Sequence, residues 1–270
     1  MKTFNVIGKP VSQSKSPKIF NFIFKYLKIN AIYKSKEISN INDLKIFIDN
    51  CKDAGINGLN ITMPYKQKLL SIIDNKDDIV QLTKSINCIK INKNNITGHN
   101  NDYYGFKQLL SINNVHINKT NNIVLGSGGS ARTVILYLIQ NNAKNIKILS
   151  RNKKTSLEII KDFKSLSCKT TISPFCNQTT YPDYNLINCT PIGLKKDTEK
   201  NILSQIVRIH FNVIIDINYI YDSDFLDLSY KKIITGEDMF IFQAFKSLDI
   251  WFESKISDKL DYKKIKELIC

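Results

Sequence analysis

The feature of this chain that most constrains its fold is a glycine turn, GSGGSA, at residues 126–131. The turn follows a strand pattern at 122–125 and opens a helical pattern at 131–141. Glycine allows a tight turn and a close approach of the backbone to a bound group, and the free N–H groups of a helix N-terminus favour an anion. A strand, a glycine turn and a helix in this order predict an α/β unit with a parallel sheet.

The glycine turn has two interpretations. It fits the phosphate-binding loop of dinucleotide-binding domains, in which the pyrophosphate lies against the helix N-terminus. Its spacing is GxGG rather than GxGxxG, so an ordinary strand-to-helix loop is the alternative. The flanking strand and helix favour the cofactor loop.

The end of the next predicted strand, at 146–149, indicates which nicotinamide cofactor fits. The residues that follow, SRNKK at 150–154, include no acid. NAD sites place Asp or Glu here for the ribose 2′-hydroxyl, whereas NADP sites place Arg, whose guanidinium suits the 2′-phosphate. The sequence therefore predicts NADP over NAD, with a solvated basic loop as the alternative.

Short strand patterns alternate with helical patterns along the rest of the chain. We expect strands at 4–8, 31–35, 58–62, 186–188 and 213–217, a hairpin of 86–91 with 95–98, and helices at 17–27, 42–53, 104–110 and 240–255. The stretch 65–85 is expected to be mostly helical, and the polar stretch 113–122 is the candidate domain boundary by composition. The aromatic-rich last helix is expected to pack back on the first part of the chain.

Length and composition indicate a soluble protein of two domains. The chain has 270 residues and is 43% hydrophobic, which is enough for two cores. Its first residues form no apolar signal region, and no stretch approaches the roughly 18 apolar residues of a membrane span. We therefore expect a cytoplasmic protein with no membrane partner.

Cysteine, histidine and charge exclude several other classes. The six cysteines include no C-x-x-C pair and the three histidines are isolated, so neither a metal site nor a disulfide framework is expected. The net charge of +15 is spread along the chain without a basic block interleaved with aromatics. We attribute it to composition, with a secondary benefit for steering anionic ligands, and expect no nucleic-acid partner.

The run NITMPYK, residues 60–66, places short polar side chains at the end of a predicted strand. Alternate strand residues share a face, so Asn60 and Thr62 point the same way, and Pro64 then ends regular pairing and leaves Lys66 at the rim. Taken alone, this is a strand end with a solvated lysine. The glycine turn and a lone Asp102 elsewhere in the chain favour a functional role.

The chain resembles the shikimate dehydrogenase family from residue 6 to residue 244, in five motifs in the right order: SQSKSP (12–17), NITMPYK (60–66), GHNNDYYG (98–105), NCTPIG (188–193) and GEDMFIFQA (236–244). The resemblance implies an α/β substrate domain, 1–101 with 236–270, that faces a Rossmann-like NADP domain, 102–235, across a cleft. It further implies reversible, NADPH-dependent reduction of 3-dehydroshikimate to shikimate on the pathway to chorismate and aromatic amino acids, by a monomer or homodimer.

The resemblance also assigns residues. Lys66 and Asp102 match the catalytic pair. The positions that match substrate contacts are Ser14, Ser16, Thr62, Lys66, Asn87, Asp102, Tyr219 and Gln243. Those that match cofactor contacts are Asp78, Gly126, Ser127, Gly128, Gly129, Ser130, Ser150, Arg151, Asn152, Thr155, Ile217 and Gly236.

Elementary chemistry agrees with the catalytic assignment. A hydride that reaches a carbonyl carbon builds negative charge on the oxygen, which a positioned cation stabilises and protonates. Lys66 is the candidate, although an ordinary lysine pKa of about 10.4 requires tuning for this duty. Asp102 is expected to orient Lys66 and to accept a bond from a substrate hydroxyl.

Several of these residues have a structural alternative. Ser16 before Pro17 has the pattern of an N-cap, which is compatible with ligand binding, and Asp102 is a candidate cap for a helix from residue 103. Tyr219 and Gln243 suit packing roles equally well. Asn87 suits a turn.

The chain departs from the family pattern at several positions. Cys88 and Asn101 stand where the family usually has Thr, which affects substrate positioning. Ser150, Asn152 and Thr155 replace the usual Asn, Thr and second Arg of the cofactor loop, where Lys153 or Lys154 is a substitute. Tyr221 stands where a Pro is usual.

Two other functions remain as alternatives. One is a quinate/shikimate dehydrogenase that uses NAD, which Ser16 and the missing acid after the strand at 146–149 disfavour. The other is a non-catalytic NADP-sensing or nucleic-acid-binding protein, suggested by the fold and the charge. The presence of both Lys66 and Asp102 disfavours that class.

Overall fold

The computed structural model describes residues 1–93, 95–176, 183–192, 200–219 and 224–269. It forms two compact units: unit 1 contains residues 1–105 and 240–270, and unit 2 contains residues 106–239. The divisions fall within two helices, α4 (Asp102–Ile112) and α8 (Glu237–Phe252). Neither lies in the polar stretch 113–122, where composition alone suggested a boundary.

Unit 1 contains a six-stranded mixed sheet in the order β2-β1-β3-β5-β6-β4. Its strands are β1 (Lys2–Gly8), β2 (Ala31–Glu37), β3 (Ile56–Ile61), β4 (Asn75–Lys76), β5 (Cys88–Ile91) and β6 (Ile96–His99). β1 pairs in parallel with β2 and β3, and β5 is antiparallel to β3 and β6. The predicted hairpin is therefore confirmed as β5 and β6.

The helices of unit 1 are mostly where the sequence predicted them. They are α1 (Ser16–Tyr26), α2 (Ile41–Asn50), η1 (Lys68–Ser71), α3 (Asp78–Thr83), η3 (Ile256–Lys259) and α9 (Tyr262–Lys266), with parts of α4 and α8. The prediction for 65–85 was wrong in its middle, where β4 pairs with β6. The reason is local, because Asp77 caps the start of α3 and leaves the two residues before it extended.

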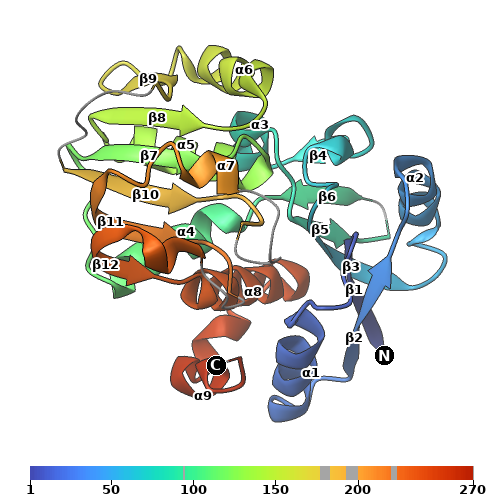
Figure 1. The fold of residues 1–270 in the computed structure, drawn as a ribbon. Helices are drawn as coiled ribbons and strands as arrows, with labels where there is room; N and C mark the ends of the chain where they lie inside the picture. The colour runs from blue at the N-terminus through green and yellow to red at the C-terminus, as the bar shows by residue number, and fades with distance from the viewer. Residues whose placement is uncertain (94, 177–182, 193–199, 220–223, 270) are drawn as a thin grey trace. The chain divides into compact units, whose positions relative to one another are not determined.

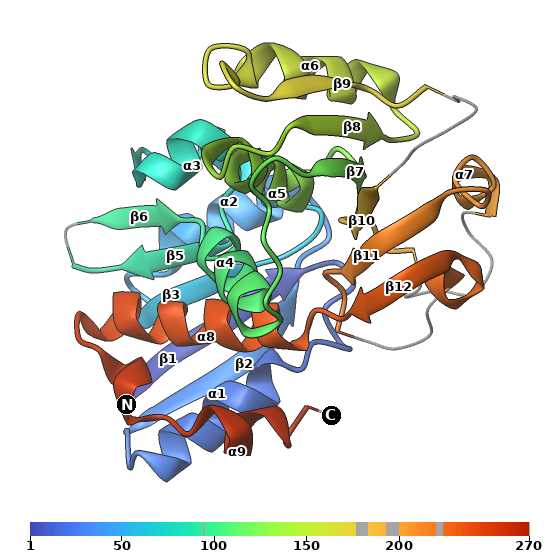
Figure 2. The ribbon, with the colours of Figure 1, turned by 90° about the vertical axis from the view of Figure 1, so that its left-hand side faces the viewer.

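Apolar side chains cover both faces of the unit 1 sheet. On one face, Leu44 and Ile48 of α2 pack with Leu59, Leu69 and the rest of a buried cluster. On the other face lie α1 and α8, and Figure 2 shows α8 running beside β3 and β5. Such two-sided burial fixes the strand ends that carry polar side chains.

Trp251 attaches α8 to the sheet. Its ring stacks on Phe4 with centroids 4.6 Å apart, and its Nε1 donates a hydrogen bond of 3.0 Å to the Ile89 carbonyl. A Cβ at Gly58 would lie 2.3 Å from the indole nitrogen, so glycine provides the space that the ring occupies. The part of α8 from residue 240 onward is thus an integral part of unit 1.

Unit 2 contains a six-stranded, all-parallel sheet in the order β12-β11-β10-β7-β8-β9, visible edge to edge in Figure 1. The strands are β7 (Asn121–Leu125), β8 (Asn145–Leu149), β9 (Thr171–Pro174), β10 (Tyr184–Asn188), β11 (His210–Asp216) and β12 (Ser229–Ile234). Relative to β7 this is the Rossmann order, whose ligand crevice lies beyond the carboxyl ends of β7 and β10, where the strand order reverses.

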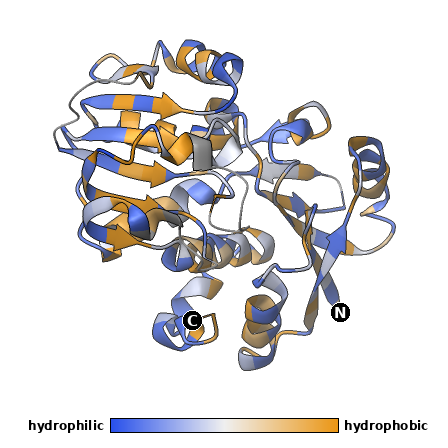
Figure 3. Cartoon of the chain, in the orientation of Figure 1, coloured by the Kyte–Doolittle hydropathy of each residue, from blue (hydrophilic) through white to orange (hydrophobic). Residues whose placement is uncertain are grey.

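Helices connect the strands of unit 2, and its core is apolar. They are α5 (Gly129–Gln140), α6 (Lys153–Phe163), α7 (Lys200–Leu203) and η2 (Asp224–Asp227). Leu125, Leu186 and Phe211 lie in a buried cluster, and Figure 3 shows the hydrophobic colour concentrated along the central strands. A strand buried on both faces is typical of a parallel sheet.

No helix among the described residues is both long enough and apolar enough to cross a membrane.

Replacement of Trp251 by Ala tests the attachment of α8. We expect the free energy of unfolding to fall by about 3–5 kcal/mol, because a buried aromatic ring and its hydrogen bond are lost together. Urea unfolding followed by circular dichroism measures the change. Ile46→Ala is the matched control, since Ile46 is 60% exposed in the same unit, and it is expected to change stability by less than about 0.5 kcal/mol. Equal effects of the two substitutions would contradict this account of the packing.

Candidate active site

The structure brings Lys66 and Asp102 together. The Lys66 Nζ lies 2.6 Å from Asp102 Oδ2, and the two side chains are 18% and 8% exposed. Lys66 lies in the turn after β3 and Asp102 is the first residue of α4. An ammonium and a carboxylate at this distance form a charge-assisted hydrogen bond that holds both side chains in place.

Asn87 holds the other side of Asp102. Its Nδ2 donates to Asp102 Oδ1 at 2.7 Å, and its Oδ1 accepts a bond of 2.7 Å from the Asn101 amide. Each oxygen of Asp102 therefore has a side-chain partner, Lys66 on one and Asn87 on the other. Asn87 is not a turn-filling residue, because both ends of its amide orient the residues before α4.

The Ser14–Ser16 loop leads into α1 in a way that differs from the prediction. Ser16 is the first helical residue and is 5% exposed, while Lys15 occupies the N-cap position and makes no side-chain cap bond. The N-cap assignment of Ser16 was therefore wrong: Pro17 fixes the first turn, and the Ser16 amide donates instead to Ser14 Oγ at 3.3 Å. The Lys15 Nζ donates to the Ile269 carbonyl at 2.5 Å and attaches this loop to the C-terminal residues.

Thr62 lies directly beyond β3, next to Gly8 at the end of β1. Its amide donates to the Ile7 carbonyl at 2.9 Å. A Cβ at Gly8 would lie only 2.3 Å from Thr62 Cγ2, so glycine is required for the two strand ends to approach this closely.

Gln243 and Tyr219 belong to different units. Gln243 lies on α8 in unit 1, is 9% exposed and donates from Nε2 to the Phe240 carbonyl at 3.0 Å. Tyr219 follows β11 in unit 2 and is partly exposed. The structure leaves both substrate assignments as predictions.

The glycine turn has the geometry that a dinucleotide requires. Gly126 has φ +104°, a conformation that residues with a Cβ rarely adopt, and an added Cβ would lie 3.0 Å from Thr190 Cγ2 and 3.3 Å from the Cys189 carbonyl. Gly128 is the N-cap of α5, and Gly129 and Ser130 form its first turn. A close backbone approach and a helix N-terminus at the strand-order reversal fit the pyrophosphate of a nucleotide.

The residues after β8 form an ordered basic loop beside this turn. Asn152 is the N-cap of α6 and accepts bonds from the Lys154 and Thr155 amides at 3.0 and 3.3 Å. The Thr155 hydroxyl lies 2.5 Å from Ser127 Oγ in the glycine turn, and Ser150 Oγ donates to the Asn152 carbonyl at 2.9 Å. The departures in this loop thus have a structural role, and the exposed Arg151 lies between two of them in the chain.

A buried carboxylate organises the loops after β10 and β11. Asp216 Oδ1 accepts bonds from Asn188 Nδ2 at 2.9 Å and from the Asn218 amide at 3.0 Å. Burial raises the pKa of Asp216 to about 6, although these hydrogen bonds lower it in part. The Asn218 Nδ2 donates to the Thr190 carbonyl at 2.9 Å, so the carboxylate indirectly holds the loop that borders Gly126.

Gly236 and Ile217 lie on the same side of unit 2. The Gly236 amide donates to the Asn218 carbonyl at 2.9 Å, and an added Cβ would lie 2.1 Å from the Ile217 carbonyl oxygen. Any side chain at position 236 would therefore displace the backbone after β11. Gly193 and Tyr221, which the sequence also singled out, lie outside the described residues.

Asp78 lies in unit 1, whereas the other predicted cofactor residues lie in unit 2. It is exposed in the first turn of α3 in unit 1, where its neighbour Asp77 caps the helix.

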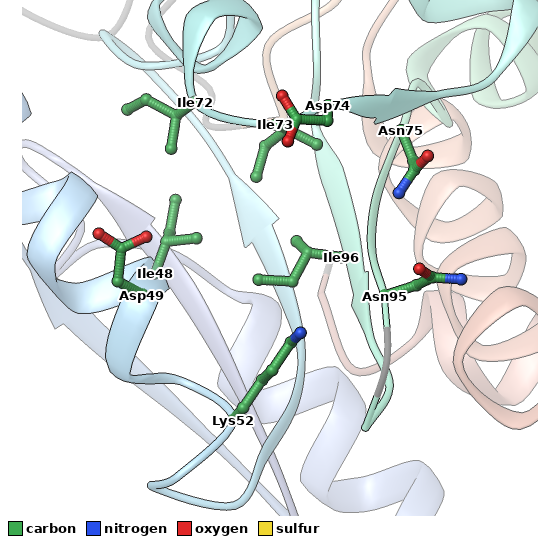
Figure 4. Close-up of a pocket in the computed structure, with 9 residues that line it drawn as sticks. All are labelled: Ile48, Asp49, Lys52, Ile72, Ile73, Asp74, Asn75, Asn95 and Ile96. Atoms are coloured by element: carbon green, nitrogen blue, oxygen red, sulfur yellow. The ribbon is translucent and has the colours of Figure 1, made fainter.

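Unit 1 also contains a surface pocket of about 240 Å³ that includes none of the predicted site residues. Figure 4 shows Ile48, Ile73 and Ile96 in it, with Lys52 and Asp74 among the surrounding polar groups. Its apolar floor belongs to the core cluster beneath α2.

Among the described residues, no three His, Cys, Asp or Glu side chains gather in a group that could hold a metal ion.

The structure adds Ser247, to which the sequence assigned no role, and gives it a partner from the NITMPYK run. Asn60 of β3 and Ser247 of α8 are 6% and 0% exposed and share a hydrogen bond of 3.0 Å. A signal was available for Ser247, because it lies four residues after Gln243 and so on the same face of the helix. Asn101 also bonds to Ser247, so this departure from the family pattern lies beside Asp102 and belongs to the same network.

Comparisons with known proteins point to one family. The family described as "Shikimate dehydrogenase substrate binding domain" matches residues 6–89. A shikimate dehydrogenase (NADP(+)) of Clostridium beijerinckii is 34% identical over 264 residues, which cover 96% of this chain and 95% of that protein. One of Clostridium perfringens strain 13 is 31% identical over 274 residues, covering 100% and 99%.

A solved structure that contains a shikimate 5-dehydrogenase also matches this chain. The chorismate mutase/shikimate 5-dehydrogenase fusion protein from Clostridium acetobutylicum matches with a TM-score of 0.78 and 29% identity. The match covers 100% of this chain and 96% of that chain.

Asp216→Asn tests the buried carboxylate through its pH dependence. The pKa of about 6 in the folded protein lies above the ordinary 3.8, so between these values the folded protein binds more protons than the unfolded chain. Ionisation of Asp216 therefore lowers the stability of the wild type as the pH rises through this range. We expect the stability of the variant relative to wild type to increase over the same range and to stay level above it.

Urea unfolding at a series of pH values measures this difference. Asp227→Asn, at an exposed carboxylate of the same unit, controls for the loss of one charge. A stability difference for Asp216→Asn that is the same at both ends of the pH range would contradict the account.

Proposed function

This chain belongs to the shikimate dehydrogenase family, and from that membership we propose that it reduces 3-dehydroshikimate to shikimate with NADPH through Lys66 and Asp102. It is an oxidoreductase that uses NADP. The observation that carries the roles of the two residues is the 2.6 Å pair of Lys66 Nζ and Asp102 Oδ2, with Asn87 on the second carboxylate oxygen.

Lys66 is proposed to donate the proton in the reduction. NADPH supplies the hydride when it is bound. The positive Nζ of Lys66 stabilises the charge that develops on the carbonyl oxygen and then transfers a proton to it, and in the reverse direction it accepts that proton. Its partial burial increases the effect, because water screens the charge less.

Asp102 is proposed to orient both Lys66 and the substrate. Its Oδ2 fixes the ammonium, and Asn87 fixes the plane of the carboxylate through Oδ1. Carboxylate oxygens have further lone pairs, so each accepts a substrate hydroxyl without releasing its protein partner. Asp102 therefore ties the position of the proton donor to that of the ring hydroxyls.

The remaining substrate contacts are proposed from the predicted positions. Ser14 and Ser16 offer hydroxyls beside the N-terminus of α1, suited to the carboxylate of shikimate, and Thr62 lies four residues before Lys66 in the chain. Tyr219 and Gln243 are proposed to complete the ring contacts. Unit 1 is proposed as the substrate-binding part, in keeping with the family match over residues 6–89.

Unit 2 is proposed as the NADP-binding part. The glycine turn, from Gly126 to Ser130, would hold the pyrophosphate, and Arg151 would hold the 2′-phosphate. The ordered Ser127–Thr155 contact supports this, because it joins the phosphate loop to the basic loop. We also propose that Asp78 contacts the cofactor. The protein is further proposed to lie in the cytoplasm, as a monomer or a homodimer.

Lys66→Ala is expected to lower kcat by about 10²–10⁴-fold, because the proton donor is lost. The Kd for NADPH is expected to stay within about twofold, since the glycine turn and basic loop are unchanged. Initial rates of NADPH oxidation with 3-dehydroshikimate, together with NADPH fluorescence titration, measure both quantities. Lys68→Ala is the matched control, an exposed lysine two positions further along. Rates like wild type in the Lys66 variant would refute its assigned role.

Arg151→Ala is expected to raise the KM for NADPH by about tenfold or more and to leave the KM for NADH nearly unchanged, since only NADPH carries the 2′-phosphate. Arg208→Ala, at an exposed arginine of the same unit, serves as control. The same assay with quinate and NAD tests the alternative of a quinate/shikimate dehydrogenase. Equal increases for both cofactors in Arg151→Ala would show that the side chain does not select the phosphate.

A further inference from the structure

The hydroxyl of Ser247 lies at a fully buried junction of unit 1. It accepts hydrogen bonds from Asn60 Nδ2 and from Asn101 Nδ2, both at 3.0 Å, and it donates to the Gln243 carbonyl at 2.9 Å. A serine hydroxyl has one donor and two acceptor sites, so all of its capacity is used. The Ser247 side chain is 0% exposed, so water is not available to replace any of these partners.

One branch from this junction leads to Asp102. Asn101, held at its side chain by Ser247, donates from its backbone amide to Asn87 Oδ1 at 2.7 Å. Asn87 in turn donates to Asp102 Oδ1, and Oδ2 of the same carboxylate accepts a bond from Lys66. Because Asn101 directly precedes Asp102, the bond to Ser247 also restrains the backbone from which the carboxylate projects.

A second branch leads along α8. The Gln243 carbonyl that accepts the Ser247 hydroxyl belongs to a residue whose side chain is a proposed substrate contact. The bond is an ordinary one between residues four apart, and it aims the hydroxyl oxygen at the two amides. Ser247 is therefore a short link between the helix that carries Gln243 and the loop that carries Asp102.

The third branch anchors the junction to the sheet. Asn60 Oδ1 accepts a bond of 2.7 Å from the Tyr33 hydroxyl of β2, and Tyr33 stacks on Phe20 of α1 with centroids 4.3 Å apart. Buried polar groups that are fully satisfied in this way specify one arrangement of the elements that they join.

We propose that Ser247 is a positioning residue for the reaction: through Asn101 and Asn87 it sets Asp102, and through α8 it sets Gln243, so that both address one substrate. This inference rests on the proposed roles of Lys66, Asp102 and Gln243. Ser247 itself acts through these residues.

Ser247→Ala is the direct test. It removes the shared acceptor and leaves two buried amide donors facing a methyl group, so Asn101 is free to shift. We expect kcat/KM for 3-dehydroshikimate to fall by about ten- to a hundredfold, since small misplacements of reacting groups have effects of this size. The KM for NADPH is expected to stay within about twofold, because the glycine turn and the basic loop belong to unit 2.

Ser85→Ala is the matched control. Ser85 is also 0% exposed in unit 1, and its Oγ has no hydrogen-bond partner among the described residues. The same deletion of one buried hydroxyl is therefore made without breaking a bond, and activity is expected to stay within about twofold of wild type.

A double-mutant cycle with Asn101→Ala separates positioning from general stability. If Ser247 acts through Asn101, the double variant loses no more than about twofold beyond the more damaged single variant, because both substitutions break one link. Ser247→Cys keeps the site filled with a weaker hydrogen-bonding group and is expected to show an intermediate loss, which keeps the test valid if the Ala variant does not fold.

Three outcomes would overturn the inference. Ser247→Ala with the kcat/KM of wild type would show that the link does not matter, and multiplicative losses in the cycle would show that Ser247 acts by another route. If wild-type protein does not oxidise NADPH with 3-dehydroshikimate, the proposed function fails and this inference with it.

Discussion

The candidate site of unit 1 depends on the carboxylate of Asp102, whose two oxygens bind the Lys66 ammonium and the Asn87 side-chain amide. A carboxylate that is 8% exposed needs partners on both oxygens, and Lys66 and Asn87 provide them. Those partners come from the turn after β3 and from the residue before β5, so this network of three side chains joins three separate chain segments. The same contacts that offset its desolvation leave a positive group positioned beside a hydrogen-bond acceptor.

Unit 2 also has a buried carboxylate held by hydrogen bonds, that of Asp216, but its partners are uncharged. Among the described residues Asp216 has amide partners and no cation, so burial dominates and raises its pKa to about 6. Its role is to hold Asn188 and Asn218, which shape the loops beside the glycine turn. One buried carboxylate thus belongs to a proton-transfer pair, and the other orders the surroundings of the cofactor loop.

The sequence predicted the parts of this protein that depend on local pattern. The glycine turn and the hairpin of β5 and β6 follow from patterns whose spacing has a direct physical meaning, whereas the pairing of Lys66 with Asp102 was expected from the family resemblance. It did not predict β4, which depends on pairing with a distant strand, or the N-cap of α1, which shifted by one residue to Lys15. Ser247 was missed because its role depends on Asn60 and Asn101, far away in the sequence.

The central claim is that Lys66 and Asp102 act as one unit in the reduction of 3-dehydroshikimate. A double-mutant cycle of Lys66→Ala and Asp102→Asn, read as kcat for NADPH oxidation, tests it most directly. The account predicts that the double variant is no more than about threefold slower than the slower single variant, because either change disables the same unit. Losses that multiply in the double variant would contradict it and would show that the two residues act independently.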